Sequence, residues 1–347
     1  ELTYEEYLNF HRTYYHPSNS YIYLYGNMDM EEKLNWLDQE YLSAYDKKEV
    51  DSEIHLQKPF EKMHDITKPY SIASNESTED NTYLSYNKVI GTSLDEKLYL
   101  AFQILDYALL SAPGAPITKA LLEAGIGKDI SGSYDSSTYQ PIFSIVAKNA
   151  NEEQKAEFVK VIEDTLKGIV ENGMDKKALE AGINYHEFRY READFGGYPK
   201  GLMYGLQIFD SWLYDDNAAF LLLETQDAMD ELYKKAEGNY FEQLIKECLI
   251  DNSFGVVAMA VPKVGLDAEN EEKTAEKLRA YKDSLSKEEI EEIVRHTKEL
   301  KEYQETPSTK EELETIPMLT RADITRDVLP LYNEERSMDG VKLLFHE

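Results

Sequence analysis

The sequence predicts an α+β fold: an antiparallel or mixed sheet with helices packed on one face, followed by a long helical hairpin. Paired apolar segments between residues 61 and 150 are separated by polar turns and are typical of strands. Helical periodicity then runs to about residue 247 and precedes one more strand-like segment. Strand pairs followed by helices favour helices on one sheet face. The later run 266–306 lacks Gly and Pro and is rich in Lys and Glu, as expected of paired helices.

Residues 1–46 are predicted to form a helix, a strand and a second helix. Thr3 and Glu6 have the spacing of a capping box at the first helix start. The segment 21–25 alternates like a strand and is ended by Gly26, and Asp29 is placed to cap the second helix. This is too little chain to bury a core alone, so we expect it to pack on other parts. Residues 47–60 are polar and are interpreted as a linker.

Residues 61–264 are predicted to form one self-consistent α+β unit. Strands are expected at 63–73, 81–90, 128–135, 140–149 and 254–261. A helix is predicted to start at the box formed by Ser93 and Glu96 and to end near Ala112, and a short helix over 117–124 is closed by Gly125. Three or four helices should then run to about residue 247, with breaks at 173–175 and 196–199.

The run 266–306 is predicted to be two helices and not one rod. Ser286 and Glu289 form a capping box in the middle of the run, which marks a second helix start. Its apolar positions make only a thin stripe, which suits a strap across other domains. A final strand is expected from about Val341.

Charge and cysteine content exclude several function classes. The 67 acidic and 37 basic side chains give a net charge of −30, which repels nucleic acid and anionic membrane surfaces. No stretch approaches about 18 consecutive apolar residues, so no membrane span is predicted. The single cysteine, Cys248, permits no disulfide within the chain. That composition fits a reducing compartment, and we expect a cytoplasmic location.

The sequence contains no recognisable catalytic or metal site. Seven histidines are present, and none has the spacing of a zinc motif. His186-Glu187 begins like the H-E-x-x-H motif, but Tyr190 occupies its last position. His346-Glu347 could open such a motif, although the residues before it are strand-like. Cys248 lies in a helical apolar run and is interpreted as a core residue. We therefore predict no catalytic residue and no metal ligand in this chain.

Four motifs nevertheless occur in a characteristic order. They are Phe10-His11-Arg12 with Tyr14-Tyr15-His16-Pro17-Ser18-Asn19-Ser20, Leu109 to Ile117 with Gly125-Ile126-Gly127-Lys128, Glu187 to Gly196, and Lys301 to Pro307 with Ile316 to Leu319. Together they resemble the pitrilysin/insulinase superfamily of zinc metallopeptidases, in its presequence-protease-like branch. The matches span nearly the whole chain.

The resemblance implies a four-domain clamshell that encloses a chamber for unfolded peptides. It assigns 1–46 to the tail of the first, catalytic domain, 47–60 to a linker and 61–264 to a second, non-catalytic domain. It assigns 265–326 to the hairpin and linker between the two halves and 327–347 to the start of the third domain. The zinc ligands of the parent enzyme would precede this chain and the completing arginine and tyrosine would follow it, so both chain ends are interpreted as cut. This segment would bind no zinc, and its partners would be peptide substrates and the remaining domains.

The resemblance also implies one binding role. In insulin-degrading relatives, an edge strand of the second domain pairs with the far end of the substrate. The matching residues here are Asp129, Ile130, Ser131, Gly132, Ser133 and Tyr134. Gly132 would let a peptide backbone approach closely. The competing interpretation is an ordinary sheet edge blunted by Ser and Asp.

Two further hypotheses apply to the chain as a whole. The first is a catalytically silent homologue that acts as a peptide-binding or scaffold subunit. The second is a coiled-coil adaptor built on 266–306, which would leave the α+β unit unexplained.

Overall fold

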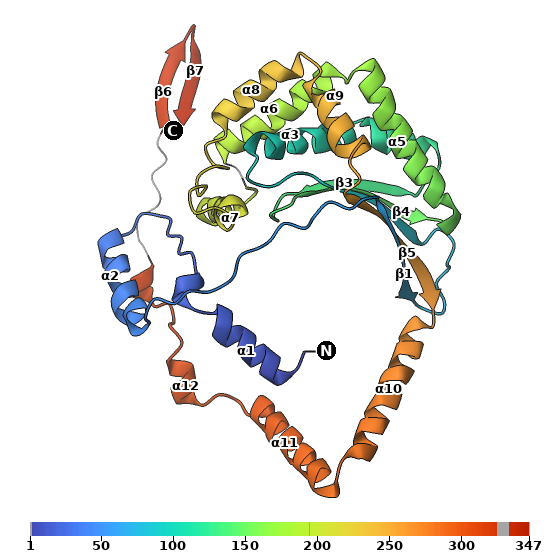
Figure 1. The fold of residues 1–347 in the computed structure, drawn as a ribbon. Coiled ribbons are helices and arrows are strands. Elements are labelled where there is room, and N and C mark those ends of the chain that lie inside the picture. Colours follow the sequence, from blue (N-terminus) through green and yellow to red (C-terminus); the bar gives the residue numbers. More distant parts are fainter. Residues whose placement is uncertain (1, 194, 325–332, 347) are drawn as a thin grey trace. The chain divides into compact units, whose positions relative to one another are not determined.

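The computed structural model describes residues 2–193, 195–324 and 333–346. The chain divides into two compact units, Glu1–Asn270 and Glu271–Glu347 (Figure 1). The first unit combines one mixed sheet with helices, so the predicted α+β class is confirmed. The second contains helices and a strand pair.

The first unit is organised by a five-stranded sheet. Its strands are β1 (His64–Ile72), β2 (Thr82–Val89), β3 (Asp129–Asp135), β4 (Ile142–Ala150) and β5 (Gly255–Val264). All five were expected, within a few residues of these bounds. Their spatial order is β1-β5-β2-β4-β3, with β1 parallel to β5 and every other pair antiparallel. The sheet is therefore mixed, and the last strand in sequence lies between the first two.

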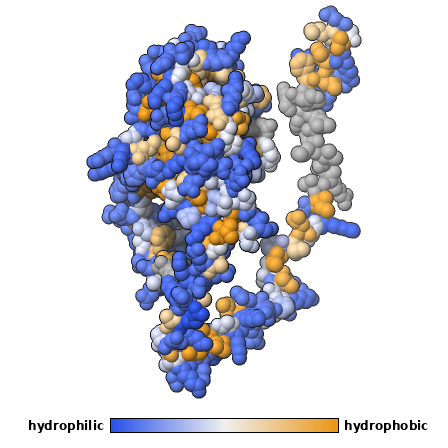
Figure 2. Space-filling model, turned by 90° about the vertical axis from the view of Figure 1, so that its right-hand side faces the viewer, coloured by the Kyte–Doolittle hydropathy of each residue, from blue (hydrophilic) through white to orange (hydrophobic). Residues whose placement is uncertain are grey.

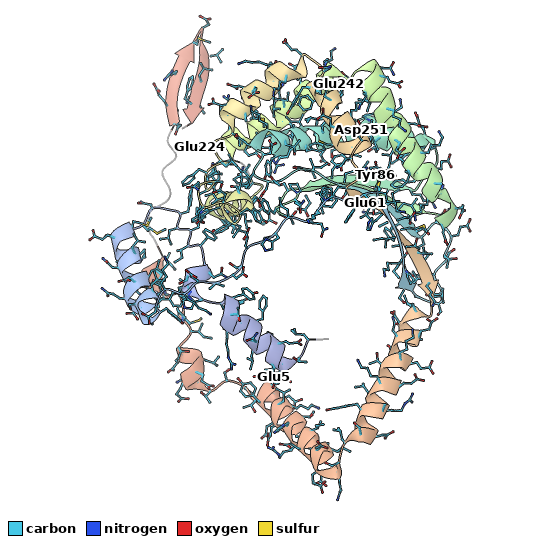
Figure 3. All side chains as sticks on the ribbon, in the orientation of Figure 1. Glu5, Glu61, Tyr86, Glu224, Glu242 and Asp251 are labelled. Atoms are coloured by element: carbon cyan, nitrogen blue, oxygen red, sulfur yellow. The ribbon has the colours of Figure 1, made fainter. Side chains whose placement is uncertain are left out.

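Helices cover one face of this sheet (Figure 1). They are α3 (Glu96–Asp106), α4 (Pro116–Glu123), α5 (Lys155–Asn172), α6 (Lys176–Glu192), α8 (Gln226–Ala236) and α9 (Tyr240–Leu244). Burial alternates along β2 and β4, as expected when one sheet face meets a helical layer and the other does not. Tyr86 on β2 shows the contact between layers: it is buried, and its hydroxyl donates to the Leu249 carbonyl at 3.2 Å (Figure 3).

The start of α3 differs from the sequence prediction. Ser93 was expected to cap it, but the N-cap is Asp95, whose side chain accepts from the Leu98 backbone N–H at 3.0 Å. Ser93 is fully buried instead, because its segment turns into the core. The helix also runs beyond Asp106 as a π-helix, Tyr107–Ser111, and ends before Ala112 as expected.

The segment 21–25 is not a strand in this structure, which corrects the prediction. Among the described residues no strand lies beside it, so its alternating tyrosines pack on helix α7 (Lys200–Trp212) instead. Tyr23 and Tyr25 occupy the space that a Cβ would fill at Gly205 and Gly201. Residues two apart in an extended chain and four apart on a helix have nearly equal spacing, about 6 to 7 Å, so the two rows match.

The remaining elements of the first unit follow the sequence signals closely. Helix α1 (Tyr4–Tyr14) has the expected capping box at Thr3, and α2 (Met30–Glu40) is capped by Asp29. Residues 47–60 contain no helix or strand. The breaks at 173–175 and 196–199 are present, but five helices and not three or four lie between β4 and β5, because further breaks occur after Trp212 and Ala236.

The second unit begins within α10 (Leu266–Ser284) and continues with α11 (Lys287–Glu305) and α12 (Lys310–Glu314). Ser286 caps α11 with the expected box, which confirms two helices in place of one rod. No residue of either long helix is buried, in keeping with the thin apolar stripe. The expected strand is β7 (Val341–His346), and it pairs with β6 (Asn333–Met338), which was not predicted. Glu347 of the His346-Glu347 pair and the junction 325–332 lie outside the described residues.

The surface agrees with the strong negative charge. The face in Figure 2 is mainly hydrophilic, with hydrophobic residues in scattered patches. In the part of the chain that the structure describes, each helix is either too short or too polar to traverse a lipid bilayer.

Candidate functional site

The six residues singled out from the sequence, Asp129 to Tyr134, lie together on β3 at one end of the sheet. Among the described residues, β4 is the only strand that pairs with β3. The opposite end of the sheet is β1, which carries Pro69 within the strand. Because proline has no N–H to offer, it interrupts the β1 edge, whereas β3 contains no proline. The two edges therefore differ in their capacity to accept another strand.

Backbone register determines which groups of β3 face outward. The Ile90 N–H donates to the Pro141 carbonyl at 2.8 Å, and this pair continues the β2–β4 register. Hydrogen-bonded partners alternate along antiparallel strands, so odd-numbered β4 residues bond to β2 and even-numbered ones to β3. Through the pairing of Ser133 with Ser144, the odd-numbered β3 residues bond inward. The outward N–H and C=O groups are therefore those of Ile130, Gly132 and Tyr134.

Gly132 has a structural reason within the domain. A Cβ there would meet the Leu110 side chain at 2.2 Å and the Ser144 carbonyl at 2.9 Å. The glycine thus allows the π-helix after α3 to pack against β3. The direction that a side chain would take is filled from inside, so it leaves no additional space for a peptide.

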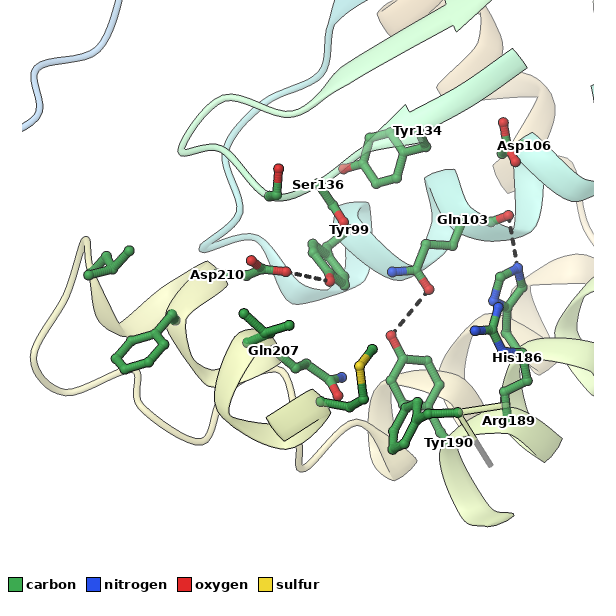
Figure 4. Close-up of a pocket in the computed structure, with 16 residues that line it drawn as sticks. Tyr99, Gln103, Asp106, Tyr134, Ser136, His186, Arg189, Tyr190, Gln207 and Asp210 are labelled. Carbon is green, nitrogen blue, oxygen red and sulfur yellow. Dashed lines mark hydrogen bonds between the residues drawn. The ribbon is translucent and has the colours of Figure 1, made fainter. Parts of the chain in front are cut away.

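Tyr134 connects β3 to a cavity of about 660 Å³ (Figure 4). The cavity lies between the end of β3, α3, α6 and α7. Its lining is mostly apolar and aromatic, and its polar members come from four parts of the chain. The residues that matter here are Tyr99, Gln103, Tyr134, Tyr190, Phe195, Met203, Leu206 and Asp210.

Hydrogen bonds hold three polar groups of the cavity wall. The Tyr99 hydroxyl donates to Asp210 Oδ2 at 3.3 Å, and the Tyr190 hydroxyl donates to Gln103 Oε1 at 3.1 Å (Figure 4). His186 Nε2 lies 3.1 Å from the Gln103 carbonyl. The Tyr134 hydroxyl is buried and has no hydrogen-bond partner among the described residues.

Burial displaces the pKa values of the ionisable groups in this region. It raises the pKa of Asp210 to about 6, with smaller contributions from the Tyr99 hydrogen bond, which lowers it, and from Asp135, which raises it. Burial also lowers the pKa of His186 to about 4, so this imidazole is neutral at physiological pH. Asp210 is mostly ionised there. No ion pair of Asp210 is recorded among the described residues.

The side chains with metal-binding or nucleophilic chemistry do not form a metal site. His186 sits on α6 with its ring against α3, and no group of three or more His, Cys, Asp or Glu side chains among the described residues could hold a metal ion. Burial raises the pKa of the Cys248 thiol to about 11, which keeps it protonated and supports its interpretation as a packing residue. The described residues of this chain therefore do not fit a zinc ion.

The cavity was not predicted from the sequence. Tyr99, Tyr134, Tyr190 and Asp210 lie on four different elements, and no motif joins them. Only Tyr134 belonged to the predicted set. A local pattern could not reveal the others, because their proximity depends on how α3, α6 and α7 pack.

Two family descriptions match the chain. Residues 1–185 match the family described as "Peptidase M16 inactive domain", and residues 261–347 match a region described as associated with subfamily C of the M16 peptidases. Among curated proteins, the chain is 45% identical to "Protein HypA" of Clostridium perfringens, over 100% of this chain and 36% of that protein. It is 33% identical to "Presequence protease 1, chloroplastic/mitochondrial" of Arabidopsis thaliana, over 100% of this chain and 33% of that protein. The chain thus spans about a third of the length of these relatives.

Solved structures show the same fold at low sequence identity. A peptidase M16 inactive domain from Pseudomonas fluorescens has a TM-score of 0.53 at 16% identity, covering 76% of this chain and 58% of that one. The first half of the periplasmic protease PqqL from Escherichia coli has a TM-score of 0.52 at 14% identity, covering 75% and 55%. These similarities concern the fold.

Proposed function

This chain belongs to the peptidase M16 family, and from that premise we propose that it is a non-catalytic segment of a longer zinc-dependent endopeptidase that degrades peptides or unfolded segments. Its relatives include presequence proteases, and it carries an inactive domain of the family. In the proposed enzyme, the domain built on the five-stranded sheet forms part of the wall of an enclosed chamber, and the β3 edge anchors the substrate.

One observation supports the anchoring role. The sheet has a single proline-free edge, and at that edge the backbone groups of Ile130, Gly132 and Tyr134 face outward. An extended peptide can add to such an edge through main-chain hydrogen bonds, so the contact tolerates many sequences. That tolerance suits an enzyme that degrades diverse unfolded chains.

Cleavage is proposed to need the remaining domains of the same polypeptide. The described residues offer no group that fits zinc, so no catalytic step is assigned to them. We expect the isolated chain to cleave peptides no faster than buffer does, whereas the complete polypeptide cleaves them in a chelator-sensitive way. Cleavage by the isolated chain that a chelator stops would contradict the proposal. The cytoplasmic location expected from the sequence remains part of the proposal, as do peptide substrates.

Replacing Ile130 with proline is expected to weaken the binding of long peptides by the complete polypeptide about tenfold. The Ile130 N–H faces outward, so proline removes one donor from the edge, worth about 1 kcal/mol, and places its ring where the peptide would lie. Fluorescence anisotropy with a labelled unstructured peptide measures the affinity, with a chelator present to prevent cleavage.

The matched control is Ile130→Ala, which removes the same side-chain packing but keeps the outward N–H. It should bind peptide within about twofold of the original protein, because the edge donors are unchanged. Equal affinities for the proline and alanine variants would show that β3 does not anchor peptides. Thermal unfolding of both variants identifies any general loss of structure.

A further inference from the structure

We propose that the cavity beside Tyr134 is a subsite that receives a cationic group of the peptide bound along β3. This inference rests on the proposed function, since it presumes a strand added at that edge. It goes further by giving one position of the bound chain a chemical preference, and by assigning that preference to Asp210.

The direction of side chains along an added strand leads to the cavity. Successive side chains of a strand point to opposite sheet faces, and residues directly opposite on neighbouring strands have Cβ atoms about 4.5 to 5.5 Å apart on the same face. Tyr134 packs on the helical side of the sheet, with its ring centroid 5.6 Å from that of Phe102 on α3. The peptide residue opposite Tyr134 therefore directs its side chain to the same side, where the cavity lies (Figure 4).

The cavity suits a long side chain with a charged end. Its walls include Phe195, Met203 and Leu206, against which a methylene stem can pack. Asp210 lies in the same wall, and its only recorded partner among the described residues is the neutral Tyr99 hydroxyl. A carboxylate held by one neutral donor retains acceptor capacity for a lysine ammonium or an arginine guanidinium.

The groups around Asp210 leave its charge uncompensated. Asp135 of β3 adds to the negative potential, and Tyr99 of α3 contributes a neutral hydroxyl. From α6, His186 is neutral because burial lowers its pKa to about 4. Arg189 also lines the cavity, but its guanidinium lies over the Tyr185 ring, 5.7 Å from the ring centre. An incoming cation thus supplies the counter-charge that Asp210 lacks.

The test measures peptide binding to the complete polypeptide in the presence of a chelator. The probe is a labelled unstructured peptide with one central lysine, compared with the same peptide carrying norleucine in place of lysine. Asp210→Asn is the test variant, because asparagine keeps the shape and an acceptor for the Tyr99 hydroxyl. Asp230→Asn on the exposed part of α8 controls for the change in net charge. Asp210→Glu retains the charge.

We expect Asp210→Asn to weaken binding of the lysine peptide about tenfold and to leave the norleucine peptide unchanged. Asp230→Asn should change neither affinity, and Asp210→Glu should retain the preference for lysine. In the original protein the preference should fall as the pH is lowered through about 6, where Asp210 becomes protonated, and this pH dependence should be absent in Asp210→Asn. A lysine preference that survives Asp210→Asn would overturn the proposal.

Two further arms separate the possible outcomes. N-terminal acetylation of both peptides removes the other cation of an unfolded chain. A loss on acetylation that depends on Asp210 assigns the subsite to the peptide amino terminus, and a loss on norleucine substitution assigns it to a side chain. If Ile130→Pro weakens binding while Asp210→Asn does not, the edge is supported and the subsite is wrong. If neither variant weakens binding, or the protein binds no peptide, both proposals fail.

Discussion

Replacing Phe102 with alanine is expected to lower the free energy of unfolding by about 3 to 5 kcal/mol. Phe102 is fully buried on α3, and its ring centroid lies 5.8 Å from that of Phe143 on β4 and 5.6 Å from that of Tyr134 on β3. The ring therefore joins the helical layer to two strands. Truncation removes its buried apolar surface and leaves a cavity that these neighbours fill only in part. Urea denaturation followed by circular dichroism measures the change.

The control is Phe188→Ala on α6, because that ring is 64% exposed. Its removal should change the free energy of unfolding by less than about 0.5 kcal/mol, as for most surface substitutions. Similar losses in the two variants would show that the core does not centre on Phe102. Since Tyr134 lines the cavity and packs on Phe102, the Phe102→Ala variant should also weaken binding of lysine peptides.

Replacing Asp106 with asparagine is expected to stabilise the protein above neutral pH by about 2 to 3 kcal/mol. Burial raises the pKa of Asp106 from 3.8 to about 6, and Oδ1 has no hydrogen-bond partner among the described residues. The folded protein therefore holds its proton more tightly than the unfolded chain. This contribution to stability is favourable at low pH and is lost as the pH rises from 3.8 through about 6. Asparagine cannot ionise and avoids that loss.

The measurement is urea denaturation of both proteins between about pH 4.5 and pH 8. The difference in free energy of unfolding should grow with pH in favour of Asp106→Asn and level off above about pH 7. Asp230→Asn is again the exposed control and should show no such trend. A constant difference across this range would mean that Asp106 ionises equally in the folded and unfolded states.

Short-range patterns located most helices and strands. The capping boxes at Thr3 and Ser286 were correct because each involves groups three residues apart, whose contact depends on nothing else. The box at Ser93 was wrong, since Asp95 offers a competing cap two residues later and Ser93 is drawn into the core. The segment 21–25 has the alternation of a strand, but a strand also needs a neighbour, and the described residues supply none.

Long-range arrangement was beyond local patterns. Nothing near Gly255 or His64 indicates that β5 separates β1 from β2, because pairing depends on which apolar faces meet in the folded chain. The resemblance placed Asp129 to Tyr134 on an edge strand, and the sheet order agrees with that position. Their role in binding remains a prediction. The cavity and Asp210 could not be predicted because carboxylates and tyrosines are abundant in this sequence, and only packing distinguishes a buried one.

The unequal edges of the sheet have a consequence for handling the isolated protein. With Pro69 in β1 and no proline in β3, β3 is the edge at which the sheet can extend. A second molecule presents the same edge, and two antiparallel copies of β3 can pair about a two-fold axis. Such homodimers would occupy the backbone groups needed by a peptide. Apparent affinities should therefore decline as protein concentration rises, and titrations are best performed with the protein dilute.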